Sequence, residues 1–214
     1  MRLKSIGKPF KNYILWICLI FTLGGCAFGH KFDYSLQPNV TYSGKGSVAL
    51  AVHDQRPYIK DFSKMPDFVG SVRSLYGIPY PVYTESGKPL AEDISQGLMT
   101  ALKNAGFSVN SLNLSLSYSK EEAISKLRAT GSDRLIYVVL NEWWSDTLHQ
   151  SMIRMDVILL VLDKEGKELA ISKLKEQVGL GFVAAIDEIP KVYVRQFNKL
   201  INDPEVKAAL SNLP

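Results

Sequence analysis

The chain has 214 residues, of which 46% are hydrophobic and 21% are charged. This composition excludes a disordered or collagen-like chain and is typical of a globular domain. The formal net charge is +4, but the four excess positive charges, Arg2, Lys4, Lys8 and Lys11, all lie before residue 26. The 21 basic and 21 acidic residues that follow leave the rest of the chain neutral, which disfavours a nucleic-acid partner.

The amino terminus has the features of a secretion signal. A basic stretch, Met1 to Lys11, is followed by an apolar run at 13–23 and then by two glycines, which is the order found in signal peptides. As a helix the apolar run would be about 16 Å long, whereas a bilayer core is about 30 Å thick. We therefore predict a signal peptide over residues 1–25, with an uncleaved membrane anchor as the alternative.

The end of this segment, Leu23-Gly24-Gly25-Cys26, resembles the lipobox of bacterial lipoproteins. The resemblance implies cleavage between Gly25 and Cys26 and a diacylglyceryl group on the Cys26 sulfur, which anchors the chain in a membrane. Ala27, in place of aspartate, implies sorting to the periplasmic face of the outer membrane. The other cysteine, Cys18, lies in the signal peptide, so the mature chain has no thiol for a disulfide, a metal site or catalysis.

The mature chain divides into a tether and one domain. Residues 26–46 are polar and aperiodic and predict the lipidated cysteine with its tether, although the alternation of Phe32, Tyr34 and Leu36 leaves open a short arm packed on the domain. Residues 47–214 predict a single α/β domain with elements in the order β-α-β-α-β-β-β-α. Right-handed crossovers and hairpins then give a mixed sheet with helices packed on it, an α/β or α+β fold.

The individual elements follow from periodicity and turn signals. Strands are expected at 48–52, 107–116, 134–144, 152–162 and 168–178, and helices at 90–105, at 119–131 with a capping box at Ser119 to Glu122, near Asp187 with Pro190 in its first turn, and from Asp203. Strand 134–144 is apolar on both faces through Leu140, which predicts a central position. Strand 168–178 carries Lys173 and Lys175, which predicts an edge position with a bulge.

The segment from Gln55 to Pro89 is unusual, because it contains five prolines and six aromatic residues. The prolines predict a long loop without regular structure, and the aromatic side chains indicate that the loop packs instead of being disordered. Loops of this length in compact domains are functional when they are ordered. We therefore expect Arg73, Tyr76, Tyr80 and Tyr83 to take part in binding.

Two further candidate binding positions lie at strand ends. Asp54 and Arg56 follow the first strand, where ligands of open α/β sheets bind; they can orient a polar ligand, or form a salt bridge that pins the long loop to the sheet, which is the interpretation we favour. Trp143 and Trp144 must point to opposite faces of a strand. One is therefore expected in the core, and the other can mark a contact surface.

Evidence for catalysis or for a cofactor is weak in this sequence. Ser145, Asp146 and His149 lie within five positions, but a hydrolytic triad draws its members from separate elements, and no Gly-x-Ser-x-Gly turn is present. We prefer a turn capped by Ser145 and Asp146, with a small envelope hydrolase as an alternative. The three histidines lack ligand spacing, and Gly179-Leu180-Gly181 is too short for a phosphate loop, so we expect no metal and no cofactor.

Three motifs together carry a family resemblance: the lipobox, the run of Val52, Asp54, Arg56 and Pro57, and Leu98-x-x-x-Leu102-x-x-x-Gly106-Phe107. They resemble the YajG-like group of bacterial lipoproteins and, more loosely, auxiliary lipoproteins of envelope transport systems. The resemblance covers residues 23–26 and 48–109 and implies a small α/β domain after a lipidated cysteine.

The sequence as a whole predicts a membrane-anchored, non-enzymatic envelope protein. Its expected partner is a protein or another envelope component, bound through the segment from Gln55 to Pro89. The alternatives are a lipid-transport auxiliary protein, which would have an apolar groove between sheet and helices, and the hydrolase.

Overall fold

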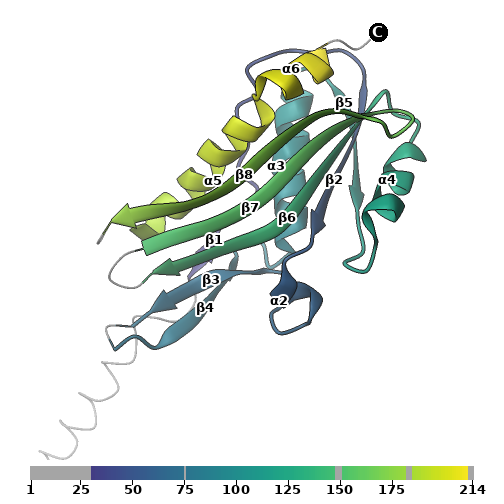
Figure 1. Ribbon diagram of the computed structural model, residues 1–214. Coiled ribbons are helices and arrows are strands. Elements are labelled where there is room, and N and C mark those ends of the chain that lie inside the picture. The colour runs from purple at the N-terminus through teal and green to yellow at the C-terminus, as the bar shows by residue number, and fades with distance from the viewer. Residues whose placement is uncertain (1–29, 75, 148–150, 182–184, 212–214) are drawn as a thin grey trace, which may run out of the picture.

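The computed structural model describes residues 30–74, 76–147, 151–181 and 185–211 (Figure 1). The predicted signal peptide, Cys26 and His149 lie outside the described residues. The elements are β1 (Lys31–Phe32), β2 (Ser47–Asp54), α2 (Pro57–Lys60), β3 (Phe68–Arg73), β4 (Pro79–Thr84), α3 (Leu90–Asn104), β5 (Ser108–Asn113), α4 (Lys120–Arg128), β6 (Arg134–Thr147), β7 (Ser151–Asp163), β8 (Glu168–Gly181), α5 (Ala185–Ile201) and α6 (Pro204–Ser211).

All of these strands belong to one mixed sheet, in which the long strand β6 is central. One edge of β6 pairs with β7, which in turn pairs with β8. Its other edge pairs in parallel with two strands, end to end: β2 lies along residues 134–140 and β3 along residues 145–147. The predicted mixed α+β fold is therefore confirmed, as are the central position of β6 and the edge position of β8.

The segment from Gln55 to Pro89, predicted as an irregular loop, instead forms α2 and the β3–β4 hairpin, so that prediction is wrong. The prolines are placed where each element tolerates them. Pro57 occupies the first turn of α2, where the missing N–H has no helical partner to lose. Pro79 and Pro81 lie on the part of β4 that extends beyond the pairing with β1, so the outer edge of the strand needs no N–H donors there.

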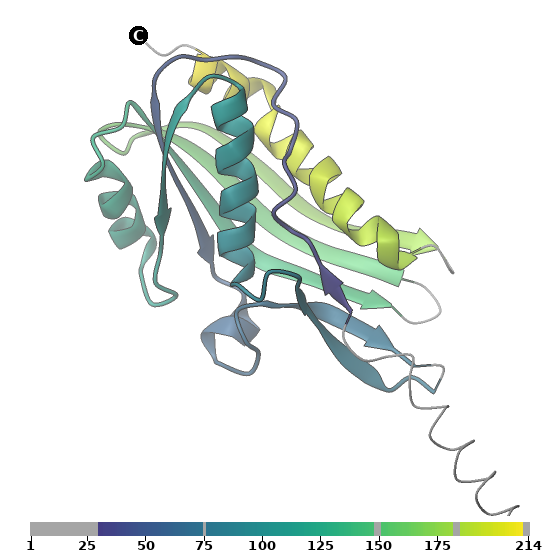
Figure 2. The ribbon, with the colours of Figure 1, turned by 180° about the vertical axis from the view of Figure 1, so that it is seen from behind.

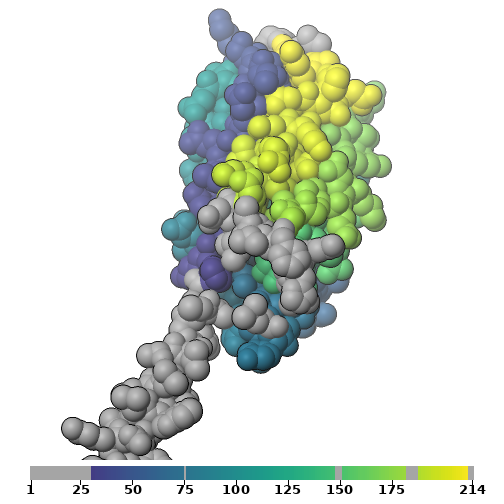
Figure 3. All heavy atoms as spheres, turned by 90° about the vertical axis from the view of Figure 1, so that its left-hand side faces the viewer, coloured from purple at the N-terminus to yellow at the C-terminus, as the bar shows by residue number. Residues whose placement is uncertain are grey.

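Residues 30–46 form an arm packed on the domain, so the predicted tether is wrong for these residues and the alternative is confirmed. Phe32 and Tyr34 are 4% and 0% exposed. The arm runs between α3 and α5 (Figures 2 and 3). Its backbone N–H groups at Asn39 and Thr41 donate to the side chains of Asn198 and Asn202, at 2.6 and 2.8 Å.

Helices cover the two faces of the sheet unequally. On one face lie α3, α5 and α6 with the arm, and the main core fills the space between them and the sheet (Figure 2). On the other face, α4 packs over one end only, against a smaller cluster that includes Ala49, Ala51 and Tyr137. Figure 1 looks onto this second face, which we call the open face because β6, β7 and β8 extend across it beyond α4.

Candidate functional site

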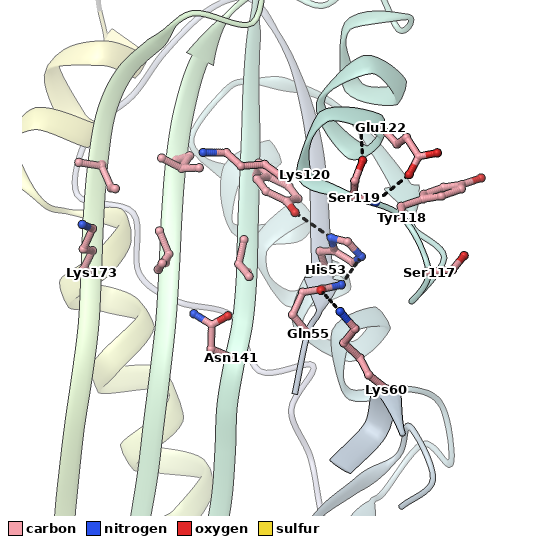
Figure 4. A pocket seen from close by; sticks show the side chains of 15 residues that line it. His53, Gln55, Lys60, Ser117, Tyr118, Ser119, Lys120, Glu122, Asn141 and Lys173 are labelled. Atoms are coloured by element: carbon pink, nitrogen blue, oxygen red, sulfur yellow. Dashed lines mark hydrogen bonds between the residues drawn. The ribbon is translucent and has the colours of Figure 1, made fainter. Parts of the chain in front are cut away.

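A groove of about 730 Å³ lies on the open face, beside the start of α4 (Figure 4). The strand register builds its floor from two rows of side chains: Tyr137, Leu160 and Ile171 in one row, and Val139, Ile158 and Lys173 in the next. Three adjacent strands span about 10 Å, and two successive same-face residues span about 7 Å along a strand. The floor is therefore small, and five of its six side chains are largely apolar.

The wall nearest β2 is a chain of hydrogen bonds. The Tyr137 hydroxyl lies 2.7 Å from His53 Nδ1, and His53 Nε2 lies 3.0 Å from the Ser115 carbonyl oxygen and 2.6 Å from the Gln55 amide nitrogen. Lys60 Nζ donates to Gln55 Oε1 at 2.8 Å (Figure 4). This chain links β6, β2 and α2 and fixes the position of the Lys60 ammonium at the rim.

Burial favours the neutral forms of two titratable members of this chain, His53 and Tyr137. It lowers the pKa of His53, an effect opposed by the bond to the Ser115 carbonyl, and it raises the pKa of Tyr137 to about 12. Both ring nitrogens of His53 already have hydrogen-bond partners. The arrangement therefore supports shape and charge recognition better than proton transfer.

The groove carries an excess of positive charge. Lys60, Lys120 and Lys173 line it, and Glu122 is the single acidic residue among the described residues that do so. Glu122 is engaged in the predicted capping box, where its carboxylate accepts from Ser119 N–H at 2.7 Å and its own N–H donates to Ser119 Oγ at 3.1 Å. Lys120 extends from the start of α4 over the floor (Figure 4), and neither Lys120 nor Lys173 has an ion pair with any residue that the structure describes.

The predicted pair of Asp54 and Arg56 forms a buried salt bridge, as we favoured. Arg56, which is 0% exposed, binds both carboxylate oxygens of Asp54, with Nε–Oδ1 and Nη2–Oδ2 distances of 2.8 and 2.7 Å. Its Nη1 and Nη2 also donate to the carbonyls of Phe68 and Pro66, at 2.6 and 3.1 Å. The guanidinium thus pins the start of β3 to the end of β2, away from the groove.

The predicted aromatic and arginine residues are distributed over the hairpin and both faces of the sheet. Arg73 is paired with Asp146 through two contacts of 2.8 Å. Tyr76 is 92% exposed at the hairpin turn, whereas Tyr80 and Tyr83 are half-buried on β4. These residues therefore do not converge on one ligand.

The two tryptophans occupy opposite faces, as predicted. Trp143 is fully buried among Tyr34, Tyr193 and Phe197 on the helix-covered face. Trp144 is half-buried on the open face, against the rings of Tyr58 and Phe68. The phase of β6 shifts at a bulge between Leu140 and Glu142, so Leu140 and Trp143 face the same core.

The residues of the alternative hydrolase site are not assembled within the described part of the chain. Ser145 and Asp146 both lie in β6, so the predicted capped turn is wrong at these two positions. Ser145 is 1% exposed and donates to the Val69 carbonyl at 3.2 Å, while Asp146 binds Arg73. The two side chains point to opposite faces of the strand, and His149 lies outside the described residues.

Sequence analysis missed the groove residues, because the groove is created by pairing between distant segments. The available signal was the second apolar face of β7, where Ile158 and Leu160 alternate with the core residues.

The structure also shows no cluster of metal-ligating side chains among the residues it describes. Within the same residues, no helix combines the length and apolarity that a membrane span requires.

Comparisons with known proteins extend only to the fold. No protein-family model matches the chain, and no curated protein matches its sequence. A solved structure of a Xanthomonas campestris protein of the family DUF330 matches with a TM-score of 0.52 at 10% identity, covering 86% of this chain and 94% of that chain. This likeness shows a shared fold.

Two other solved structures match less closely. Lipoprotein GNA1162 from Neisseria meningitidis has a TM-score of 0.28 at 15% identity, covering 71% of this chain and 96% of that chain. The C-terminal domain of LpoB from Salmonella enterica has a TM-score of 0.32 at 9% identity, covering 67% of this chain and 87% of that chain. Neither score supports an argument about function, and the YajG-like resemblance stays a prediction.

Proposed function

We propose that this chain is a membrane-anchored, non-enzymatic binding protein of the bacterial cell envelope, held at the periplasmic face of the outer membrane by lipid on Cys26. Its ligand is an anionic molecule with one apolar chain, bound in the groove on the open face. The observation that carries this proposal is a largely apolar floor lined by three lysines, Lys60 at its rim, Lys120 over it and Lys173 at its edge on β8.

The size and exposure of the floor support a single-chain ligand. Ordinary small-molecule sites have volumes of about 300–1,000 Å³, and this groove has about 730 Å³. Val139, Ile158 and Ile171 are only half-buried in the described structure, so a ligand chain would remove apolar surface from water. A floor of about 10 by 7 Å accommodates one extended chain and is too narrow for the two chains of a phospholipid.

The charges on the rim support an acidic head group. Lys120 and Lys173 stand on opposite sides of the floor, on α4 and β8 (Figure 4). An ammonium group without a carboxylate partner is a ready donor to a carboxylate or a phosphate. The neutral net charge of the mature chain therefore conceals a local positive site.

Calorimetric titration tests the proposal. The domain is prepared without residues 1–25 and with Cys26→Ser, which removes the lipid, and dodecanoate and dodecanol are titrated below their aggregation limits. Dodecanoate is expected to bind more tightly, because loss of a charge-assisted contact of about 1.5 kcal/mol weakens binding about tenfold. Ile158→Asp should abolish binding, and Lys120→Gln with Lys173→Gln should remove the preference for the acid.

The matched control replaces Lys103 and Lys126 by Gln, because both are exposed lysines outside the groove. This control should leave both affinities unchanged. Unaltered dodecanoate binding in Ile158→Asp would show that the groove is not the binding site.

A protein partner is the second candidate, and exposed apolar residues of the segment from Gln55 to Pro89 favour it. Phe62 and Met65, in the turn after α2, are 84% and 66% exposed. A photo-crosslinking residue placed at Phe62 in intact cells tests this candidate. A specific crosslinked protein, absent when the residue is placed at Leu169 instead, would support it.

A further inference from the structure

The turn of the β3–β4 hairpin is both exposed and apolar. Tyr76 is 92% exposed and Ile78 is 53% exposed. The sequence from Ser74 to Thr84 contains no charged residue and three tyrosines. Such a surface is poorly suited to water, whereas tyrosine is enriched where proteins meet the membrane interface.

Two backbone hydrogen bonds join the described residues of the turn. Ser74 N–H donates to the Ile78 carbonyl at 2.9 Å, and Gly77 N–H donates to the Ser74 carbonyl at 2.9 Å. The ion pair between Arg73 and Asp146 ties the turn end of β3 to β6. Tyr76 and Ile78 are thus presented by a closed turn on an anchored hairpin.

The arm enters the domain from the side on which this turn lies. β1 pairs in parallel with β4, with Lys31 opposite Tyr83 and Phe32 opposite Thr84. Since β4 runs away from the turn and β1 is parallel to it, Lys31 lies at the end of β1 that is nearer to the turn. The hairpin and the first residues of the arm also lie at the same end of the molecule in Figure 3.

The distance from the anchor to the arm is short. Lys31 follows Cys26 by five positions, and five residues span at most about 18 Å even when fully extended. From Tyr83 back to Pro79, β4 covers four residues, or about 13 Å. The distance from Lys31 to the hairpin turn is therefore similar to the greatest distance that the five residues after Cys26 can span.

We infer that the hairpin turn is a second membrane contact, in which Tyr76 and Ile78 enter the headgroup region of the leaflet that holds the lipid on Cys26. This inference rests on the proposed lipid anchor but not on the ligand of the groove. Two contacts, one covalent and one through side chains, fix the orientation of the domain on the bilayer.

Site-specific fluorescence in vesicles tests the contact. The full lipoprotein carrying Tyr76→Cys is labelled with an environment-sensitive dye and placed in vesicles of phosphatidylethanolamine and phosphatidylglycerol with nitroxide-labelled lipid. The matched control is Leu169→Cys, an exposed apolar position at the start of β8. Lipid quenching is expected at residue 76 and absent at residue 169.

Each other outcome has a defined meaning. Equal quenching at both positions, high or low, would overturn the contact, as would a signal at residue 76 that depends on protein concentration instead of lipid. Failure of the anchor is distinguishable, because an unmodified Cys26 sulfur would itself react with the dye and would lack the lipid in the mass spectrum. In a second variant, Tyr76→Ser with Ile78→Ser, the protein should stay on the vesicles while lipid quenching of a dye at residue 169 appears, because the orientation of the domain is no longer fixed.

Discussion

The buried charge of Arg56 joins the end of β2 to the segment at residues 66–68, ten positions further along the chain. Its guanidinium neutralises Asp54 and satisfies the carbonyls of Pro66 and Phe68. Arg56→Ala would leave a buried carboxylate unpaired, and breaking a buried pair in this way costs about 3–5 kcal/mol. We expect this loss in the free energy of unfolding, measured by urea denaturation.

The double variant Asp54→Asn with Arg56→Met is the control, because it removes both charges together and should lose less stability than Arg56→Ala. A loss below about 1 kcal/mol in Arg56→Ala would mean that the pair behaves as a surface salt bridge.

The other residue-scale prediction concerns His53 and pH. Burial lowers the pKa of the folded state below the value of about 6.5 expected when the chain is unfolded. Below pH 6.5 the unfolded chain therefore binds the proton more readily, so stability should fall as the pH is lowered from 7 to 5. His53→Gln removes this contribution, and its thermal midpoint should change less over the same range. Equal slopes in the two proteins would contradict a depressed pKa.

At the scale of elements, Gly70 allows β3 to join β6. Its φ of +154° is a conformation that other residues rarely adopt, and an added Cβ would overlap the side chain and carbonyl of Ser145. Gly70→Ala should therefore destabilise the protein by about 2–5 kcal/mol, from strain and overpacking together. Denaturant unfolding measures this loss.

Two other glycines separate the causes of that loss. Gly77 also has a positive φ, +81°, but a Cβ added there would meet nothing within 4 Å. Gly179 has neither feature: its φ is not positive, and an added Cβ would again meet nothing within 4 Å. Gly77→Ala should show the strain alone, and Gly179→Ala should show neither effect. A Gly70→Ala loss no greater than that of Gly77→Ala would rule out the close approach to Ser145.

The arm depends on a similar close approach at Gly97 in α3. A Cβ at this position would lie 2.6 Å from the Leu36 carbonyl oxygen and 2.9 Å from that of Ser35. Gly97→Ala should therefore lift the arm from α3 and destabilise the fold by about 1–3 kcal/mol. Faster hydrogen exchange at Asn39 and Thr41, whose N–H groups donate to Asn198 in α5 and to Asn202 just after it, would report the displacement. Unchanged exchange there would show that α3 adapts instead.

The elements that local patterns determine were predictable, and those that depend on remote pairing were not. The capping box at Ser119 and the apolar stripe of β7 are local signals, and the structure confirms both. Proline content misled the prediction for β4, because the cost of proline depends on which edge of the strand is paired. The bulge after Leu140 has no signal in the sequence, since it reflects where β2 ends and β3 begins along β6.

At the scale of the whole molecule, the fold class could be derived from element order, but the groove could not. Its floor joins residues 137, 158 and 171, which become neighbours only through the registers of β6, β7 and β8. The net charge of the chain did not indicate the groove either, because the three lysines that line it come from α2, α4 and β8 and form no cluster in the sequence. A neutral chain can thus contain a local positive site that composition does not reveal.

The proposed membrane contact and the groove lie at different positions along β6. The hairpin joins β6 at residues 145–147, whereas the floor residue Val139 lies eight positions before Thr147. Eight strand residues span about 26 Å. With the hairpin turn on the leaflet, the groove therefore lies about 26 Å along β6 from the strand end that the hairpin joins, so the two proposed contacts are separate sites.

The length of the tether provides the final prediction, because it sets how strongly the anchor favours the hairpin contact. Inserting about twelve Gly and Ser residues after Ala27 lengthens the five-residue connection between Cys26 and Lys31 about threefold. The effective concentration of the hairpin turn at the membrane falls as roughly the −3/2 power of length, or about sixfold. The anchored protein should remain on the vesicles, while lipid quenching of the dye at residue 76 decreases. Undiminished quenching would mean that the hairpin holds the membrane without help from the tether, and loss of the protein from the vesicles would mean that the insertion had disrupted the anchor itself.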